Sequence, residues 1–341
     1  MAHTIPSLRT LATMLTLATM VAVQPGCFPR DDGGSEDEGP ATDAPSQAAF
    51  VAALPDADRL QVNLPVGLPA VYQGDLGDTS DYYLFTHEVT EDVNDFVVEV
   101  LDTISDIVSY DGDWIGPYTV AWGPLDYDAL DPVLTYFVMT WNEDDSYSWA
   151  LYEFPRHGDP AVDGVVEAAG EIAPGANASE SSGWFYIDYT LRQEMDPTRD
   201  VSGQVYVEYL LEPGMGATEA WFDDIVAYPG DEPTDAYYGY ATVLGGAGAM
   251  LFGFVADLNG NGTDEVMAVH SRWQADGAGR SDSTVTEGDL GETQAHVTEC
   301  WSDLFLTVHH ADDAGWEPVI GDEADCAFTP GEFPDLSDVE L

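Results

Sequence analysis

A ten-residue phrase occurs twice in this chain, and its second copy begins twenty residues after the first. Residues 182–191 read SGWFYIDYTL and residues 202–211 read SGQVYVEYLL. Both copies are rich in aromatic and β-branched residues, both begin with Ser-Gly, and the segment between them contains Pro197. These are features of two strands joined by a connection. The repeat therefore predicts antiparallel β structure, and nothing in it indicates a reaction.

Similar extended runs, separated by turn residues, continue along most of the chain. We predict strands at residues 118–122, 133–141, 147–154, 162–169, 184–191, 204–211, 219–227, 236–244, 249–256, 265–273, 280–286 and 296–308. No helical pattern interrupts them, so a meander is expected rather than a parallel sheet. Because so many strands do not stay flat, we predict a mostly β fold whose antiparallel meander forms a curved sheet, a half-barrel or a sandwich.

One segment, near residues 90–109, has the spacing of an amphipathic helix. Its apolar stripe contains Val93, Phe96, Val97, Val100, Leu101, Ile104, Ile107 and Val108. Thr90 is expected as the N-cap. The polar face is acidic, which argues against a helix that lies on a membrane surface. We therefore expect the helix to pack its stripe on the sheet.

The charge of the chain is strongly one-sided. It has 64 aspartates and glutamates against 8 lysines and arginines, which gives a formal net charge of -56. Such a surface repels nucleic acids and anionic lipid headgroups, so its ionic partners should be cations. We interpret the charge as an adaptation to salty surroundings, where self-repulsion is screened.

The N-terminal segment resembles an export signal. An apolar run at residues 11–23 is too short to span a bilayer and has the length of a signal-peptide core. The following residues, VQPGC at 23–27, resemble the lipobox of bacterial lipoproteins. The resemblance implies that residues 1–26 are removed and that Cys27 is acylated and anchors the protein to a membrane. The alternative is ordinary signal cleavage that leaves Cys27 as a free thiol.

Composition divides the remainder of the chain into three parts. Residues 27–46 are rich in Gly, Pro, Asp and Glu and are expected to be a disordered acidic tether. Residues 47–316 should form a single β-rich domain, followed by an acidic tail at residues 317–341. Cys300 and Cys326 can pair in an exported protein and fix that tail, although two buried free thiols are the alternative.

The best candidate for a metal site is the segment DLNGNGTDE at residues 257–265. It resembles the Asp-rich calcium loops of EF-hand-like and integrin-type repeat proteins. That resemblance implies that Asp257, Asn259, Asn261, the Thr263 carbonyl and Glu265 could supply oxygen ligands to Ca²⁺. The alternative is a plain hairpin turn, because Asn-Gly is among the strongest turn signals.

No catalytic motif is recognised in the sequence, since Gly-x-Ser-x-Gly, His-Glu-x-x-His and a phosphate loop are all absent. His309 and His310 are neighbours on a predicted strand, so their side chains should point to opposite faces and would not bind one metal ion. We expect a solvated strand end there. The aromatic residues, such as Trp184 and Trp221, could form a platform for sugars or could simply pack in the sheet.

We therefore expect a non-enzymatic, lipid-anchored protein of the bacterial outer membrane, on its periplasmic face or at the cell surface, with a binding or scaffolding role. A curved sheet with a helix also resembles, in architecture only, the carriers that shuttle lipids or lipoproteins across the periplasm. An apolar cavity between helix and sheet would favour such a role. A surface carbohydrate-binding module and a secreted glycan hydrolase are the alternatives.

Overall fold

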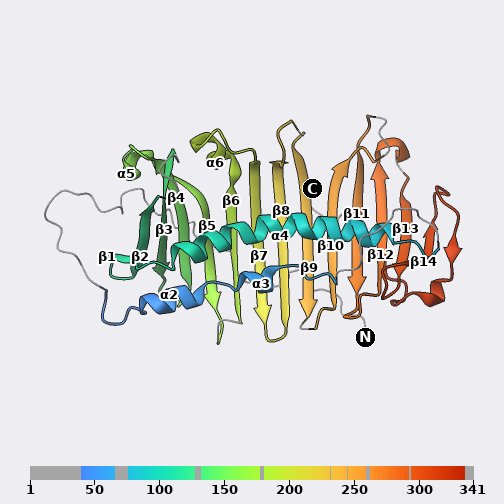
Figure 1. The fold of residues 1–341 in the computed structure, drawn as a ribbon, viewed down its shortest axis with the longest axis horizontal. Coiled ribbons are helices and arrows are strands. Elements are labelled where there is room, and N and C mark those ends of the chain that lie inside the picture. Colours follow the sequence, from blue (N-terminus) through green and yellow to red (C-terminus); the bar gives the residue numbers. More distant parts are fainter. Residues whose placement is uncertain are drawn as a thin grey trace. The chain divides into compact units, whose positions relative to one another are not determined.

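A computed structural model describes residues 40–65, 76–126, 132–176, 180–230, 232–243, 245–258, 262–291 and 293–334. The described residues form a mostly antiparallel β structure with few helices (Figure 1). The helices are α2 (Gln47–Ala53), α3 (Ala57–Leu60), α4 (Asp81–Ile107), α5 (Pro160–Asp163), α6 (Tyr189–Met195), η1 (Gly288–Leu290) and η2 (Glu323–Asp325).

The strands follow one another in chain order, β1 to β15, in one sheet whose first and last strands are not neighbours. They are β1 (Asp113–Gly116), β2 (Thr119–Leu125), β3 (Val133–Trp141), β4 (Tyr147–Pro155), β5 (Val165–Pro174), β6 (Ser181–Asp188), β7 (Ser202–Glu212), β8 (Met215–Val226), β9 (Thr234–Val243), β10 (Gly248–Ala256), β11 (Glu265–Trp273), β12 (Gly279–Glu287), β13 (Ala295–Trp301), β14 (Thr307–Asp312) and β15 (Ile320–Gly321). The predicted antiparallel meander is confirmed.

The two copies of the repeated phrase pair with each other. They form the neighbouring strands β6 and β7, and their register places Tyr186 directly opposite Tyr206. Phe185 and Val207 are also opposite each other, and both are buried on the other face of the pair. The two copies therefore pair about their central tyrosines.

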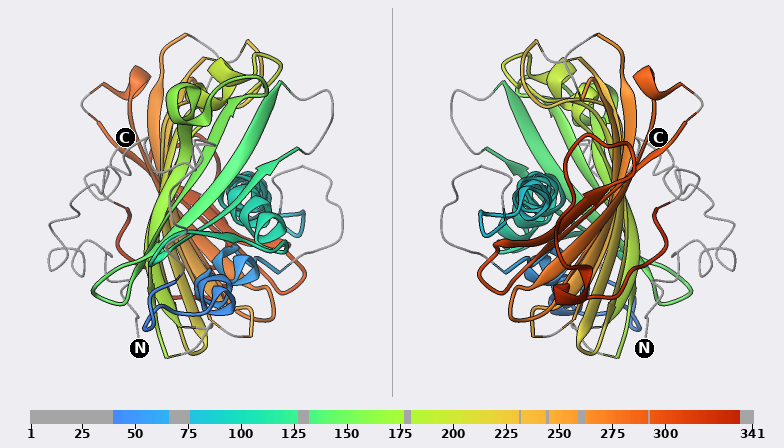
Figure 2. Two further views of the ribbon diagram at one scale, coloured as in Figure 1. Left: turned by 90° about the vertical axis from the view of Figure 1, so that its left-hand side faces the viewer. Right: turned by 90° about the vertical axis from the view of Figure 1, so that its right-hand side faces the viewer.

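The chain divides into two compact units, and each contains part of the sheet and part of α4. The first consists of Met1–Arg59, Glu99–Glu212 and Asp224–Pro233, and the second of Leu60–Val98, Pro213–Asp223 and Thr234–Leu341. Within the second unit, Figure 2 shows α4 on one side of that unit's orange strands.

In the first unit, aromatic rings from several strands form a continuous row. Trp122 contacts Phe137, Phe137 contacts Trp149, and Trp149 contacts Phe185, with ring centroids 5.5, 6.0 and 6.2 Å apart. The contact between Trp149 and Phe185 passes over β5, which lies between their strands. Gly170 on β5 is the ladder partner of both residues. A Cβ atom at Gly170 would lie 2.8 Å from the Trp149 ring, so only glycine leaves room for this contact.

In the second unit, α4 packs on strands β8, β10 and β11. Phe85 contacts Phe252 with ring centroids 5.4 Å apart, and Phe96 contacts Phe222 at 5.3 Å. The predicted stripe residues Val93 and Val97 are 1% and 0% exposed. The amphipathic helix therefore buries its apolar face against the sheet, as predicted.

Helix α4 begins at Asp81, whereas the sequence predicted a helix only from residue 90. Ser80 is the N-cap, because its Oγ accepts a hydrogen bond from Tyr83 N at 3.0 Å. The Glu299 carboxylate on β13 also accepts the N–H groups of Asp81 and Tyr82 at 3.2 and 3.3 Å. Thr90 is not the N-cap, since it lies inside the helix and its hydroxyl donates to the Thr86 carbonyl.

Several strand bounds differ from the prediction, and the sequence does not predict β1 or β15; two of the differences have a clear local cause. The strand predicted at residues 184–191 ends at Asp188, whose carboxylate accepts the Leu191 N–H at 2.9 Å and caps α6. The strand predicted at residues 296–308 is two strands, β13 and β14, and the turn between them contains Phe305 with a φ of 61°. In both cases the residues have the composition of a strand, but a local turn or helix cap ends the strand.

Candidate functional site

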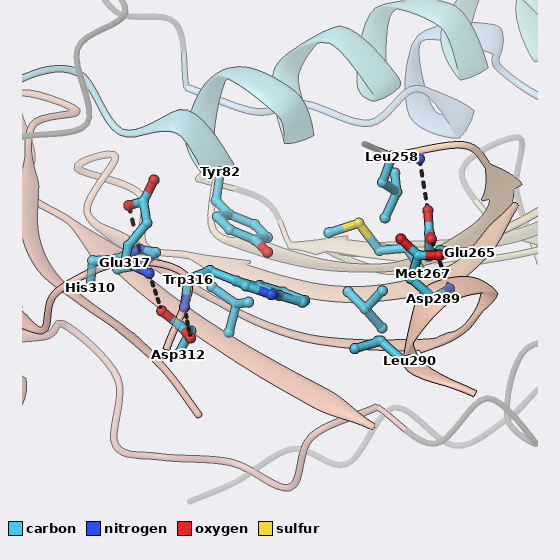
Figure 3. A pocket seen from close by; sticks show the side chains of 12 residues that line it. Tyr82, Leu258, Glu265, Met267, Asp289, Leu290, His310, Asp312, Trp316 and Glu317 are labelled. Carbon is cyan, nitrogen blue, oxygen red and sulfur yellow. Dashed lines mark hydrogen bonds and ion pairs between the residues drawn. The ribbon is translucent and has the colours of Figure 1, made fainter. Parts of the chain in front are cut away.

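A cavity with a volume of about 480 Å³ lies in the second unit, beside the first turn of α4. Strands β11, β12, β13 and β14 and the loops next to them supply the other walls (Figure 3). The lining residues are Tyr82, Leu258, Glu265, Met267, Val285, Asp289, Leu290, Val297, His310, Asp312, Trp316 and Glu317. None of the short sequence motifs singled out above predicts this set as a whole.

The floor of the cavity is apolar because of the alternation of the strands. Met267 on β11 lies directly opposite Val285 on β12, and Val297 extends the same surface on β13. These three side chains are 8%, 4% and 6% exposed, respectively. Inward-facing residues of neighbouring strands therefore form one hydrophobic wall.

Tyr82 covers this wall from α4, and its position is fixed by polar contacts. Its hydroxyl forms a 2.6 Å hydrogen bond with Ser283 Oγ, and its N–H donates to Glu299. The Thr307 hydroxyl also donates to Glu299, at 2.9 Å. Burial raises the pKa of Glu299 above its ordinary value, although the hydrogen bonds it accepts oppose the increase. This buried carboxyl thereby attaches the start of α4 to β13.

Acidic side chains stand at both ends of the cavity. At one end, Glu265 Oε2 accepts the Leu258 N–H at 3.0 Å, and Glu265 Oε1 accepts the Asp289 N–H at 3.3 Å. Glu265 is only 3% exposed. These backbone donors hold its carboxyl against the loops that flank β11 and β12.

At the other end, Asp312 accepts the N–H groups of Trp316 and Glu317 at 2.9 and 2.8 Å. Burial of Asp312 opposes its ionisation, but these backbone donors outweigh burial and lower its pKa. Glu317 lies 3.6 Å from His310 Nε2. The turn that Asp312 closes places the half-exposed Trp316 ring between the two acidic ends, below Tyr82 (Figure 3).

The two histidines at the end of β14 have different environments. His309 Nδ1 lies 3.1 Å from the Ile320 carbonyl oxygen, whereas His310 lines the cavity. Their side chains point to different sides of the strand, as expected. The expectation of a solvated strand end was wrong, because His309 is 6% exposed and the His310 side chain 12%. The tail and the 316–317 turn cover them.

The structure describes only part of the predicted calcium loop. Asn259 and Asn261 lie outside the described residues. Asp257 Oδ2 accepts the Gly262 N–H at 2.6 Å, and Glu265 lines the cavity. Among the described residues, no group of three or more His, Cys, Asp or Glu side chains is placed to hold a metal ion. Calcium binding by the complete loop, including Thr263, stays a prediction.

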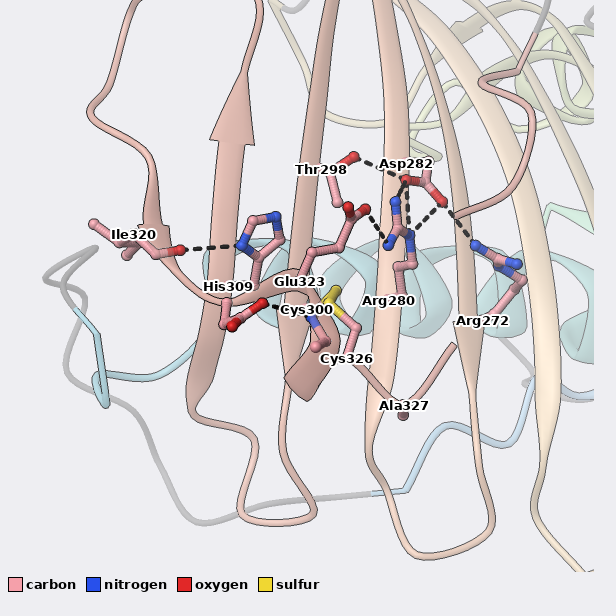
Figure 4. Close-up of a disulfide and its surroundings, with 12 residues drawn as sticks. Arg272, Arg280, Asp282, Thr298, Cys300, His309, Ile320, Glu323, Cys326 and Ala327 are labelled. Atoms are coloured by element: carbon pink, nitrogen blue, oxygen red, sulfur yellow. Dashed lines mark hydrogen bonds and ion pairs between the residues drawn. A yellow bond between two sulfur atoms is a disulfide. The ribbon is translucent and has the colours of Figure 1, made fainter. Parts of the chain in front are cut away.

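A disulfide and an ion-pair network attach the C-terminal segment to the sheet (Figure 4). Cys300 on β13 is bonded to Cys326, with the two Cα atoms 5.5 Å apart. Arg280 Nη1 lies 3.0 Å from Glu323 Oε1, and Arg280 Nη2 lies 2.7 Å from Asp282 Oδ1. Arg280 and Asp282 are 2% and 1% exposed, so this network is structural. Cys27, the predicted lipidation site, lies outside the described residues.

The first unit contains a buried cluster of carboxyl and guanidinium groups between β4, β5, α4 and α6. Arg199 binds Glu153 through both terminal nitrogens, at 2.6 and 2.8 Å. Arg192 Nε lies 3.2 Å from Glu167 Oε2, and its Nη1 lies 3.2 Å from Glu99 Oε1. Burial, followed by repulsion from Glu153, raises the pKa of Glu167 to about 8, although both arginines oppose the increase.

This cluster does not have the geometry of a hydrolase site. Glu153 and Glu167 are 3% and 2% exposed, and both face arginines. Neither lines the cavity of the second unit. A glycan hydrolase needs its two carboxyl groups on either side of an accessible bond. The cluster is better explained as part of the interior of the first unit.

The chain matches no family model, no curated protein and no solved structure. No described helix combines the length and the apolar character needed to cross a bilayer. By its fold, the protein is an open antiparallel β meander with an amphipathic helix. The second unit has an apolar cavity beside the start of this helix.

Proposed function

We propose that this protein is a non-enzymatic binding protein that holds an apolar ligand, or the apolar part of one, in the cavity beside α4. The observation that supports this function is the cavity itself, whose floor is Met267, Val285 and Val297 and whose cover is Tyr82. Its volume of about 480 Å³ lies within the range of roughly 300 to 1,000 Å³ that is typical of small-molecule sites.

The cavity is partly open to solvent, so its apolar walls contact water when no ligand is bound. A ligand that fills the space removes this wall surface and its own apolar surface from water, at about 25 cal/mol per Å². Binding would therefore be driven by the hydrophobic effect.

The location that we propose is the bacterial outer membrane, with Cys27 as the lipid anchor. The resemblance of residues 23–27 to a lipobox supports it. The disulfide between Cys300 and Cys326 also supports export, because such bonds persist mainly in oxidising compartments. On this proposal, the acidic tether at residues 27–46 separates the binding domain from the membrane.

A titration with a neutral, environment-sensitive dye such as N-phenyl-1-naphthylamine tests the binding function. We expect saturable binding at one site per chain. Leu290→Trp should weaken binding, because Leu290 lies at the edge of the cavity and a larger side chain there would fill it. Leu304→Trp is the matched control, since Leu304 is 69% exposed and does not line the cavity. Equal binding by the two variants would refute the proposal.

A surface carbohydrate-binding role is a second candidate, and a different observation favours it. Trp184, Tyr186 and Tyr206 lie on the same face of β6 and β7, opposite the buried face. The rings of Trp184 and Tyr206 are stacked, with centroids 5.9 Å apart. Aromatic faces of this kind on a sheet can stack on sugar rings, whose C–H groups form an apolar surface.

A further inference from the structure

The charges that line the cavity of the second unit are almost all negative. Of its twelve lining residues, four carry carboxyl groups and only His310 can carry a positive charge. Glu265 and Asp289 stand at one end, and Asp312 and Glu317 at the other (Figure 3). A ligand that enters the cavity therefore meets carboxylates at either end.

Backbone donors fix two of these carboxyl groups in position. Glu265 accepts N–H groups from Leu258 and Asp289, and Asp312 accepts them from Trp316 and Glu317. The loops on either side of the cavity are thus built around the acidic side chains. The negative potential is a feature of the folded cavity walls and not only of the diffuse surface charge.

Two aromatic rings lie between the acidic ends. Trp316 and Tyr82 both line the cavity, and Figure 3 shows them between the two groups of carboxylates. The face of an aromatic ring attracts cations, and indole attracts them most strongly. Carboxylates together with aromatic faces are the usual means by which proteins recognise organic ammonium groups.

We propose that the ligand is an amphiphilic organic cation, namely an alkyl or ring-bearing ammonium compound. Its apolar part packs on Met267, Val285 and Val297, and its ammonium group lies near Trp316, toward one of the two acidic ends, which carry Asp289 and Glu317 respectively. A fatty acid or another anionic amphiphile would instead place like charges close together in a partly desolvated site. The charge of the cavity thus favours cationic amphiphiles among the ligands that have an apolar part.

This inference rests on the proposed binding function, and competition against the neutral dye separates the two. The competitors are n-octylammonium, n-octanol and n-octanoate, which share one chain and differ in headgroup. The titrations are made at about 1 M NaCl, where the screening length of about 3 Å suppresses the diffuse attraction of a cation to the chain. We expect octylammonium to compete roughly tenfold better than octanol, and octanoate to compete least well.

Two double variants assign that preference to the cavity. Asp289→Asn with Glu317→Gln should remove the preference for octylammonium and leave octanol binding unchanged. Asp303→Asn with Glu332→Gln changes the net charge equally at exposed positions that do not line the cavity, so it should retain the preference. Retention of the preference by the first double variant would overturn the proposal.

The remaining outcomes are also decisive. If the dye binds and the three competitors are equivalent, the cationic ligand is refuted while the binding function stands. If the dye does not bind the wild-type chain, the binding function fails and the ligand proposal fails with it. Circular dichroism of each variant shows that a loss of binding does not come from unfolding.

Discussion

The substitution Glu167→Gln should stabilise the protein at alkaline pH and have little effect at acidic pH. Glu167 is 2% exposed, and burial followed by repulsion from Glu153 raises its pKa from an ordinary 4.5 to about 8. Below pH 4.5 the side chain is protonated in both the folded and the unfolded protein, and glutamine closely mimics the protonated form. Above pH 8 it is charged in both states, and the folded state then bears the cost of a buried charge.

The sign and the size of the effect follow from this linkage. A group whose pKa is raised on folding contributes stability below its unfolded pKa, and this contribution is lost as the pH rises through the folded pKa. The window for Glu167 therefore runs from about pH 4.5 to about pH 8. At about 1.4 kcal/mol for each pH unit in this window, the variant could gain up to about 5 kcal/mol relative to wild type.

Urea unfolding of wild type and variant at pH 5, 7 and 9.5 measures this effect. The difference between the two proteins is the relevant quantity, because it cancels the repulsion among the other carboxylates. The difference should be small at pH 5 and should favour the variant increasingly up to pH 9.5. A constant difference across the three pH values would refute the assignment of a raised pKa to Glu167.

Three further predictions concern other parts of the chain. Replacing Cys300 and Cys326 with alanine should lower the free energy of unfolding by about 3 to 4 kcal/mol, as expected for a loop of this length. Urea unfolding measures this loss, and a loss below about 1 kcal/mol would contradict the prediction. Calorimetric titration with Ca²⁺ should give binding heat that Asp257→Ala abolishes, and indistinguishable heats would rule out the calcium loop. If the protein binds carbohydrates, Trp184→Ala should reduce retention on insoluble polysaccharides. Tyr228→Ala, at another exposed aromatic residue, is the control and should not reduce it. Equal retention of the two variants would exclude the Trp184 face as the binding surface.

The sheet could be predicted from sequence because its signals are local. Extended runs rich in aromatic and β-branched residues, separated by turn residues, place most strands within a few residues of their observed ends. The repeated phrase also pairs as neighbouring strands, with Tyr186 opposite Tyr206. Such features depend on residues that are close together in the chain, so a single sequence contains them.

The start of α4 could not be predicted in this way. Tyr82, Tyr83 and Phe85 have the composition of a strand, and their helical conformation depends on the cap at Ser80 and on the Glu299 carboxylate. Glu299 comes from a strand about two hundred residues further along the chain. Tertiary contacts therefore override the local preference at the start of the helix.

The cavity could not be predicted from the sequence either, because its walls come from segments spread between residues 82 and 317. Its four carboxyl groups are four among 64, so composition could not distinguish them. The sequence indicates Glu265 as a possible calcium ligand, and the structure places it in the wall of the cavity. The sequence indicates Trp316 only as the end of the β-rich region, and no local pattern indicates that its ring lines a cavity.

If the proposed function is correct, an apolar ligand occupies the space between Tyr82 and the floor of Met267 and Val297. The most direct test is a crystal of the protein soaked with 1-bromooctane and measured at the bromine absorption edge. We expect an anomalous peak inside this cavity, in contact with those three side chains. A crystal that shows bromine only elsewhere, or side chains closing the cavity, would contradict it.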